Sequence, residues 1–211
     1  KTCLSRYTHD LVFGDSRMAI RKQQKAQTRA KIKQVAKQAF LKQGIDATST
    51  RYLSKQANIA VGTLFVHFPD KLALVKDIFF DEMEIALRTA SQHQQHVSSP
   101  VDYLQQMAHV LFIFYDDYSE FTQQVLLDSL AHGGFHTTQM AAVYDGVIMR
   151  FQQAGVDENA AHVFAENMIA NYWFVLLSGL PKGVLGRQAL DHFKRLNLPF
   201  EMSYKNALKS R

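Results

Sequence analysis

Apolar side chains recur at steps of three and four residues along most of the chain, a spacing that gathers them on one face of an α-helix. In residues 27–43 this face carries Ile32, Val35, Ala36, Ala39 and Phe40. Similar stripes follow in later segments, and no run of alternating apolar and polar residues indicates a strand. The pattern therefore predicts an all-α fold.

Residues at the breaks between the first stripes predict where the helices end. Gly44 stands at the position after a helix that favours left-handed dihedral angles. Ser49 is placed to cap a short helix over residues 50–57. Asn58 ends that helix because asparagine accepts a positive φ more readily than most residues. A third short helix is expected over residues 61–67.

The remainder of the chain predicts longer helices. Ser99 and Pro100 form an N-cap followed by a proline at the first helical position, and Asp157 is a second expected N-cap. The expected ranges are about 71–94, 101–118, 120–132, 138–154, 158–178 and 187–196, with a short helix after Pro199.

Charge divides the 211-residue chain into two parts. Residues 17–55 contain 11 Lys and Arg against one acid, whereas residues 81–166 contain 12 Asp and Glu against two bases. A basic segment suits a polyanionic partner, although a solvated helix face has the same composition. We interpret residues 18–75 as a DNA-binding domain and 76–211 as a second helical domain. Residues 1–17 show no helical period and are interpreted as a leader segment.

Residues 49–67 fit a helix-turn-helix, in which two short helices flank a tight turn after a longer first helix. Ala57, Ile59 and Leu64 are placed to lock the two helices together. The second helix can then enter a major groove. The side chains it would offer to DNA are those of Val61, Gly62, Thr63, Val66 and His67.

The residues around this motif resemble the DNA-binding domain of the tetracycline-repressor (TetR) family. The resemblance covers about residues 27–79 and rests on the helix-ending Gly44, the capped second helix, Gly62-Thr63-Leu64 with an aromatic Phe65, and the His67-Phe68-Pro69-Asp70-Lys71 that follows. Two positions differ from the family pattern. Phe65 stands where the family usually has tyrosine, and Asn58 replaces the usual glycine of the turn.

The resemblance implies a set of DNA contacts. Hydroxyls of Ser49 and Thr50 would bind phosphate, and Arg51 would reach a base edge. Lys71 would hold another phosphate. The complete candidate set is Ser49, Thr50, Arg51, Val61, Gly62, Thr63, Phe65, Val66, His67 and Lys71. The basic residues between Arg21 and Lys33 form either a phosphate-tracking arm or a solvated face.

The second domain matches no motif, and the resemblance implies that it binds a small-molecule effector and forms a homodimer. Aromatic residues at helical spacing belong to a core more often than to a cavity, but some can line a pocket. The candidate ligand contacts are Phe112, Tyr115, Phe121, Tyr144, Met168, Tyr172 and Trp173. Residues 158–178 and 187–196 are expected to form the four-helix bundle of the dimer.

Catalytic signatures are missing from the sequence. It contains no phosphate-binding glycine loop, Gly-x-Ser-x-Gly or His-Glu-x-x-His pattern. The pair His93/His96 has no carboxylate partner nearby, and His132 and His136 flank Gly133-Gly134. Surface or capping roles are expected for these histidines, and no metal and no cofactor are expected. The longest strongly apolar stretch, 168–180, is too short to span a membrane.

These features predict a dimeric, ligand-responsive transcriptional regulator, most simply a cytoplasmic repressor on a pseudo-palindromic operator. The alternatives are a DNA-binding regulator that responds to no ligand and, from another class, an α-helical carrier or enzyme.

Overall fold

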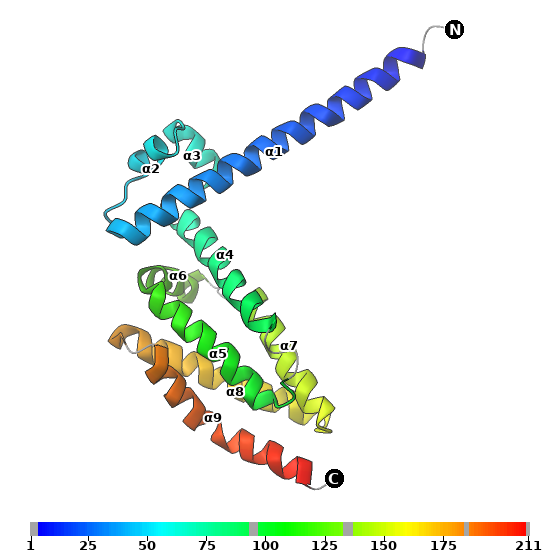
Figure 1. Ribbon diagram of the computed structural model, residues 1–211, viewed down its shortest axis with the longest axis vertical. Helices are drawn as coiled ribbons and strands as arrows, with labels where there is room; N and C mark the ends of the chain where they lie inside the picture. The colour runs from blue at the N-terminus through cyan, green and yellow to red at the C-terminus, as the bar shows by residue number, and fades with distance from the viewer. Residues whose placement is uncertain (1–3, 93–96, 133–136, 184–185, 210–211) are drawn as a thin grey trace. The chain divides into compact units, whose positions relative to one another are not determined.

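The computed structural model describes residues 4–92, 97–132, 137–183 and 186–209 (Figure 1). Every element in these ranges is helical, which confirms the predicted fold class. The chain divides into two compact units, residues 1–78 and 79–211. The boundary between these units falls within α4 (Lys71–Gln92).

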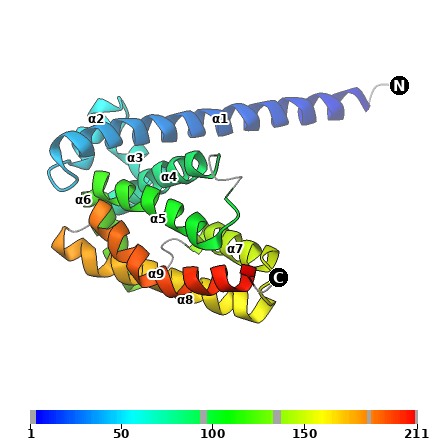
Figure 2. The ribbon, with the colours of Figure 1, turned by 60° about the horizontal axis from the view of Figure 1, so that its bottom comes forward.

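The N-terminal unit contains α1 (Leu4–Gln43), α2 (Thr50–Gln56), α3 (Val61–His67) and the first turns of α4. α1 packs on α2, and α2 packs on α3. In Figures 1 and 2, α2 and α3 lie beside the C-terminal half of α1 only, and its N-terminal half projects beyond them. The buried side chains of this unit include Ile32, Ala36, Phe40, Leu53, Leu64, Phe68 and Val75.

The helix ends follow the predicted chemistry. Gly44 has a φ of 87°, and its N–H donates to the Phe40 carbonyl at 2.9 Å. The Ser49 hydroxyl accepts the N–H of Tyr52 at 3.1 Å. Asn58 has a φ of 53°. These three local devices close α1, open α2 and turn the chain toward α3.

The sequence-based prediction places the start of the first helix too late, near residue 27. Residues 4–17, expected to show no helical period, belong to α1, which continues without interruption to Gln43. Residues 18–27 are all exposed. This part of the helix has no core to face, and the apolar stripe that marks a packed helix is therefore missing from its sequence.

The C-terminal unit is built around α5. This helix packs on α7 and α9, and α8 packs on the same two helices. Besides the rest of α4, the described residues of this unit form α5 (Pro100–Asp117), α6 (Ser119–His132), α7 (Thr137–Gln153), α8 (Glu158–Gly179), a 3₁₀ turn (Leu180–Lys182) and α9 (Gly186–Lys209). Ser99 and Asp157 cap α5 and α8 as predicted.

The last helix also differs from the prediction. α9 runs through Pro199 to Lys209, whereas the sequence predicts an end near residue 196. A proline inside a helix removes one backbone hydrogen bond. Next to this break, the side-chain amide of Asn171 on α8 donates to the Leu196 carbonyl at 3.4 Å and to the Asn197 side chain at 3.3 Å. Contacts from a neighbouring helix thus support α9 where its own ladder is interrupted.

Candidate nucleic-acid interface and ligand cavity

The turn between α2 and α3 is fixed by buried contacts. Leu53 of α2, Ala57 at the C-cap of α2 and Leu64 of α3 are each at most 1% exposed. The N–H of Ile59 donates to the Ser54 carbonyl at 3.0 Å, across the turn that Asn58 makes. α3 is therefore held in one orientation on α2, with Leu64 facing the core.

The opposite face of α3 has no partner among the described residues. Val66 is 73% exposed and Phe65 is 45% exposed, and Val61 and Gly62 are exposed as well. Thr63 and His67 are half-buried at the edges of this face. Small and apolar groups on an exposed helix can approach base edges closely and contact thymine methyl groups.

The start of α2 adds polar groups beside α3. Ser49 and Arg51 are exposed, and Thr50 is half-buried. The Ser49 hydroxyl accepts the cap bond, so its own O–H remains available as a donor. Tyr52, which the sequence-based set omits, is also exposed. A helical projection could have found it, because Tyr52 lies off the face of Leu53 and Ala57.

Arg29 of α1 fixes the C-terminal end of α3. Its guanidinium donates to the His67 carbonyl at 2.6 Å and forms an ion pair with Asp77 of α4 at 2.8 Å. The same group lies over the Phe68 ring, 4.1 Å from its centroid. Asp77 also contacts Lys33 at 3.1 Å. Arg29, part of the basic run, is thus engaged inside the unit.

Two other DNA-contact candidates also interact within the unit. Burial lowers the pKa of His67, and the charges of Lys25 and Arg29 lower it further, so the imidazole favours its neutral form. The ammonium of Lys71 donates to the Ile45 carbonyl at 2.8 Å. That bond uses one of its three donors, so a phosphate could take another. The role of both residues in DNA binding stays a prediction.

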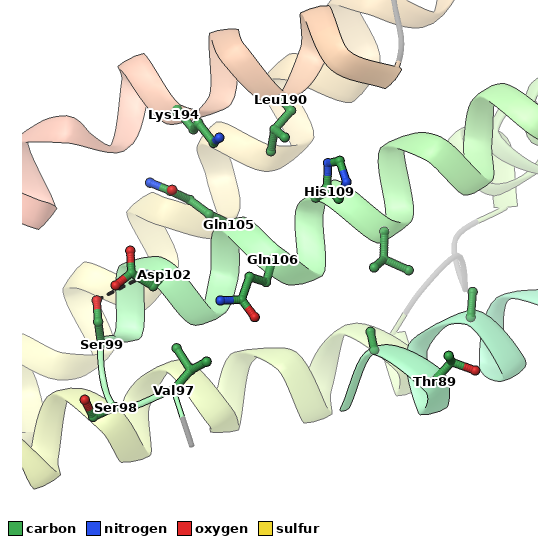
Figure 3. Close-up of a pocket in the computed structure, with 13 residues that line it drawn as sticks. Thr89, Val97, Ser98, Ser99, Asp102, Gln105, Gln106, His109, Leu190 and Lys194 are labelled. Carbon is green, nitrogen blue, oxygen red and sulfur yellow. Dashed lines mark hydrogen bonds between the residues drawn. The ribbon is translucent and has the colours of Figure 1, made fainter. Parts of the chain in front are cut away.

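The C-terminal unit contains a cavity of about 990 Å³. Figure 3 shows Lys194 and Leu190 of α9 opposite Gln105 and His109 of α5, with Thr89 contributed by α4. The lining also includes Ala86, Ala90, Val97, Ser98, Ser99, Asp102, Gln106 and Val110. Five of these residues are apolar and eight are polar or charged, so a small molecule bound here would meet hydrogen-bonding groups as well as apolar surface.

One wall of this cavity is held in place by Arg150 of α7. Its Nε donates to the Val97 carbonyl at 2.7 Å, and another guanidinium nitrogen donates to the Gly146 carbonyl at 2.9 Å. The guanidinium lies 3.7 Å from the centre of the Tyr103 ring. A Cβ at Gly146 would lie 2.6 Å from the Tyr103 hydroxyl, so glycine is required for this packing.

The seven candidate ligand contacts lie elsewhere, because none of them lines this cavity. Tyr115 and Tyr172 are completely buried, with their hydroxyls 2.5 Å apart, and burial raises the pKa of both. Tyr144 contacts His162 at 3.2 Å and is half-buried. Trp173 is also half-buried. The other five candidates are buried: Phe112, Tyr115, Phe121, Met168 and Tyr172. Their role in ligand binding stays a prediction.

Exposed apolar side chains occur on both α8 and α9. Val163, Phe174 and Leu177 of α8 are exposed at steps of 11 and three residues, which places them on one side of the helix. Leu198 and Met202 of α9 are exposed four residues apart. Exposed apolar patches of this kind mark interaction surfaces.

Within the described residues, no group of three or more His, Cys, Asp and Glu side chains could hold a metal ion. Of the two histidine pairs noted in the sequence, only His132 lies within the described residues, because His93, His96 and His136 fall outside them. No helix among the described residues is long and apolar enough to cross a membrane.

Comparisons with known proteins agree with the geometry of the N-terminal unit. Residues 32–78 match the family model of bacterial regulatory proteins of the tetR family. A comparison with curated proteins found no match. The family model describes regulators rather than enzymes, as the sequence predicts.

Three solved structures are similar to the chain. A transcriptional regulator (TerR/AcrR family) from Aquifex aeolicus VF5 is 19% identical, with a TM-score of 0.49, over 83% of this chain and 99% of that one. A putative TetR-family regulator from Mesorhizobium loti MAFF303099 is 20% identical, with a TM-score of 0.49, over 88% and 97%. A putative tetR family regulator from Shewanella sp. PV-4 is 24% identical, with a TM-score of 0.35, over 86% and 95%.

Proposed function

We propose that the chain is a DNA-binding regulator of the tetR family, whose model matches residues 32–78, and that it is a dimeric repressor released from its operator by a small molecule. The N-terminal unit binds DNA, and the C-terminal unit dimerises and binds the effector. Such a repressor acts where bacterial DNA lies, in the cytoplasm.

The exposed face of α3 is the observation that carries the DNA-binding role. Leu64 and Phe68 hold the helix on the core, while Val61, Phe65 and Val66 are left exposed. Burying that face in a major groove gives the apolar groups a partner. Ser49, Thr50 and Arg51 at the start of α2 lie where a phosphate or a base edge can meet them.

Selection of binding sites from random DNA tests this role. The selected sites should be pseudo-palindromes, because the symmetry of a two-fold dimer is mirrored in its operator. Arg51→Ala should cost roughly 1–3 kcal/mol and relax preference at one base position. Gln56→Ala, at an exposed position of α2 about 140° around the helix, is the control. Equal losses on selected and random DNA would contradict base reading by Arg51.

The dimer is best supported by the exposed apolar residues of α8, which lie within the segment 158–178 expected to form the bundle, and by those of α9, which lie just beyond the expected segment 187–196. Met168 and Val175, natural targets for a disrupting charge from the sequence alone, are at most 2% exposed in the chain's own core. Phe174 is 56% exposed and offers a cleaner test. Phe174→Glu should yield a folded monomer by light scattering, whereas Leu130→Glu, at an exposed position on α6, should stay dimeric. A dimeric Phe174→Glu variant would refute this interface.

Effector binding is supported by the cavity between α4, α5 and α9. A ligand that prefers one conformation of the C-terminal unit would shift the population toward it and change operator affinity. Val110→Trp should project an indole into the cavity and reduce the fluorescence of bound 1-anilinonaphthalene-8-sulfonate, while Leu130→Trp should retain it. Unchanged dye binding in Val110→Trp would contradict the site. An operator complex that no cavity ligand weakens would favour the ligand-independent regulator.

A further inference from the structure

One face of α1 changes its chemistry along the helix. Between Ile32 and Phe40 this face is apolar and buried in the core of the N-terminal unit. At 100° per residue, Arg21, Lys22 and Lys25 each point within about 60° of the mean direction of Ile32 and Ala36, so they lie on the same side of the helix. The side of α1 that packs on the core therefore continues as a stripe of cations beyond the core.

These cations differ from their neighbours in what they contact. Arg29 and Lys33 are both engaged with Asp77. Arg21, Lys22 and Lys25 form no ion pair with a described side chain, and they are exposed. The sequence has no Asp or Glu from residue 18 to residue 45. Their charge is therefore not neutralised along this stretch of α1.

The stripe begins where the recognition helix ends. Arg29 donates to the carbonyl of His67, the last residue of α3, and Lys25 is near enough to lower the pKa of that histidine. From Arg29 to Arg21 the helix rises about 12 Å. This length equals roughly three to four base pairs of DNA at 3.4 Å each. The cations thus extend from the edge of α3 over a few phosphates.

We propose that Arg21, Lys22 and Lys25 form a phosphate-binding face that holds the DNA backbone beside the half-site occupied by α3. This inference rests on the proposed DNA-binding function and adds a contact outside the helix-turn-helix. Lys and Arg on an exposed helix bind phosphate without reading sequence. The face should therefore raise affinity for every sequence and leave base preference to α2 and α3.

Salt dependence of binding tests the proposal on the full-length chain. The variant Arg21→Gln/Lys22→Gln/Lys25→Gln should reduce the slope of log affinity against log salt by about 0.9 for each lost phosphate contact, nearly three per subunit. The decrease should be equal on a selected operator and on random duplex DNA. The control Lys31→Gln/Lys42→Gln removes two exposed charges from other sides of α1 and should leave the slope almost unchanged. Circular dichroism should show the same helix content in all three proteins.

Duplex length gives a second readout. On an operator trimmed to the base pairs that α3 covers, the triple variant and the unaltered chain should bind alike, and the difference should return when flanking base pairs are added. An unchanged slope in the triple variant, an equal decrease in the control, or an effect independent of duplex length would overturn the proposal. Sequence-specific binding that persists in those cases would leave the proposed function intact. If the unaltered chain binds no DNA, both are refuted.

Discussion

Gly62 is the residue at which the needs of the fold and of DNA binding are best separated. It is the second residue of α3 and is exposed, and a Cβ built on it meets no heavy atom within 4 Å. Its φ is not positive. Nothing in the fold therefore requires glycine here. Alanine should stabilise the N-terminal unit by roughly 0.5–1 kcal/mol, the usual helix-propensity difference.

The same methyl group should weaken operator binding. If α3 lies in the major groove, Gly62 is on its exposed face beside Val66 and Phe65, where the backbone can approach DNA closely. A methyl group inserted into a tightly packed contact costs roughly 1–3 kcal/mol, equivalent to about 5- to 150-fold in affinity. Gly62→Ala should therefore raise stability and lower affinity.

Two spectroscopic signals allow the stability change to be assigned to its unit. The single tryptophan, Trp173, lies in the C-terminal unit, so its fluorescence follows the unfolding of that unit. Far-ultraviolet circular dichroism follows both units. Gly62→Ala should shift the unfolding transition of the N-terminal unit, which is seen by circular dichroism, and leave the fluorescence transition unchanged. Fluorescence anisotropy of a labelled operator gives the affinity for DNA. A more stable variant with unchanged affinity would refute the close approach of α3 at Gly62.

Three further perturbations have defined outcomes. Arg29→Gln should destabilise the N-terminal unit by roughly 1–2 kcal/mol, a range already lowered because Arg29 is partly exposed. It should weaken operator binding without changing the slope of log affinity against log salt. A slope reduced by about 0.9 would instead make Arg29 a phosphate ligand. Tyr115→Phe should cost roughly 1–3 kcal/mol of C-terminal stability because Tyr172 loses its described partner, and adding Tyr172→Phe should recover part of it; a double-mutant cycle with no coupling would contradict this. The N-terminal unit should lose stability as pH falls below about 6.5, because the lowered pKa of His67 makes the unfolded state bind the proton more readily than the folded state. A His67→Gln variant with the same pH profile of stability would contradict this role of His67.

Local signals in the sequence were sufficient for the helix-turn-helix of the N-terminal unit. Gly44, Ser49 and Asn58 act through their own backbone and side-chain geometry, so their effects can be read without tertiary information. The helices over 50–56 and 61–67 followed from these positions. The exposed set on α3 followed from the same helical spacing that buries Leu64.

Features that depend on distant segments could not be predicted in this way. Pro199 is a helix breaker by itself, and contacts with other helices, such as those of Asn171 on α8, support the continuation of α9. Aromatic residues of the C-terminal unit share one spacing whether they fill a core or line a cavity. Tyr172 therefore could not be distinguished from a cavity residue until its packing against Tyr115 was known.

The contact of Gly146 with Tyr103 and Arg150 has a consequence for redesigning this protein as a biosensor. Any larger residue at 146 would collide with the Tyr103 ring, and Arg150 contacts Gly146, Tyr103 and the Val97 carbonyl. The effects of substitutions at 103, 146 and 150 should therefore depend strongly on one another. Gln105 and Gln106 enter the cavity from α5 without belonging to this set. If the cavity binds the effector as proposed, directed evolution toward a chosen ligand should accumulate substitutions at those two glutamines, and should accept changes at 103, 146 and 150 only in combination.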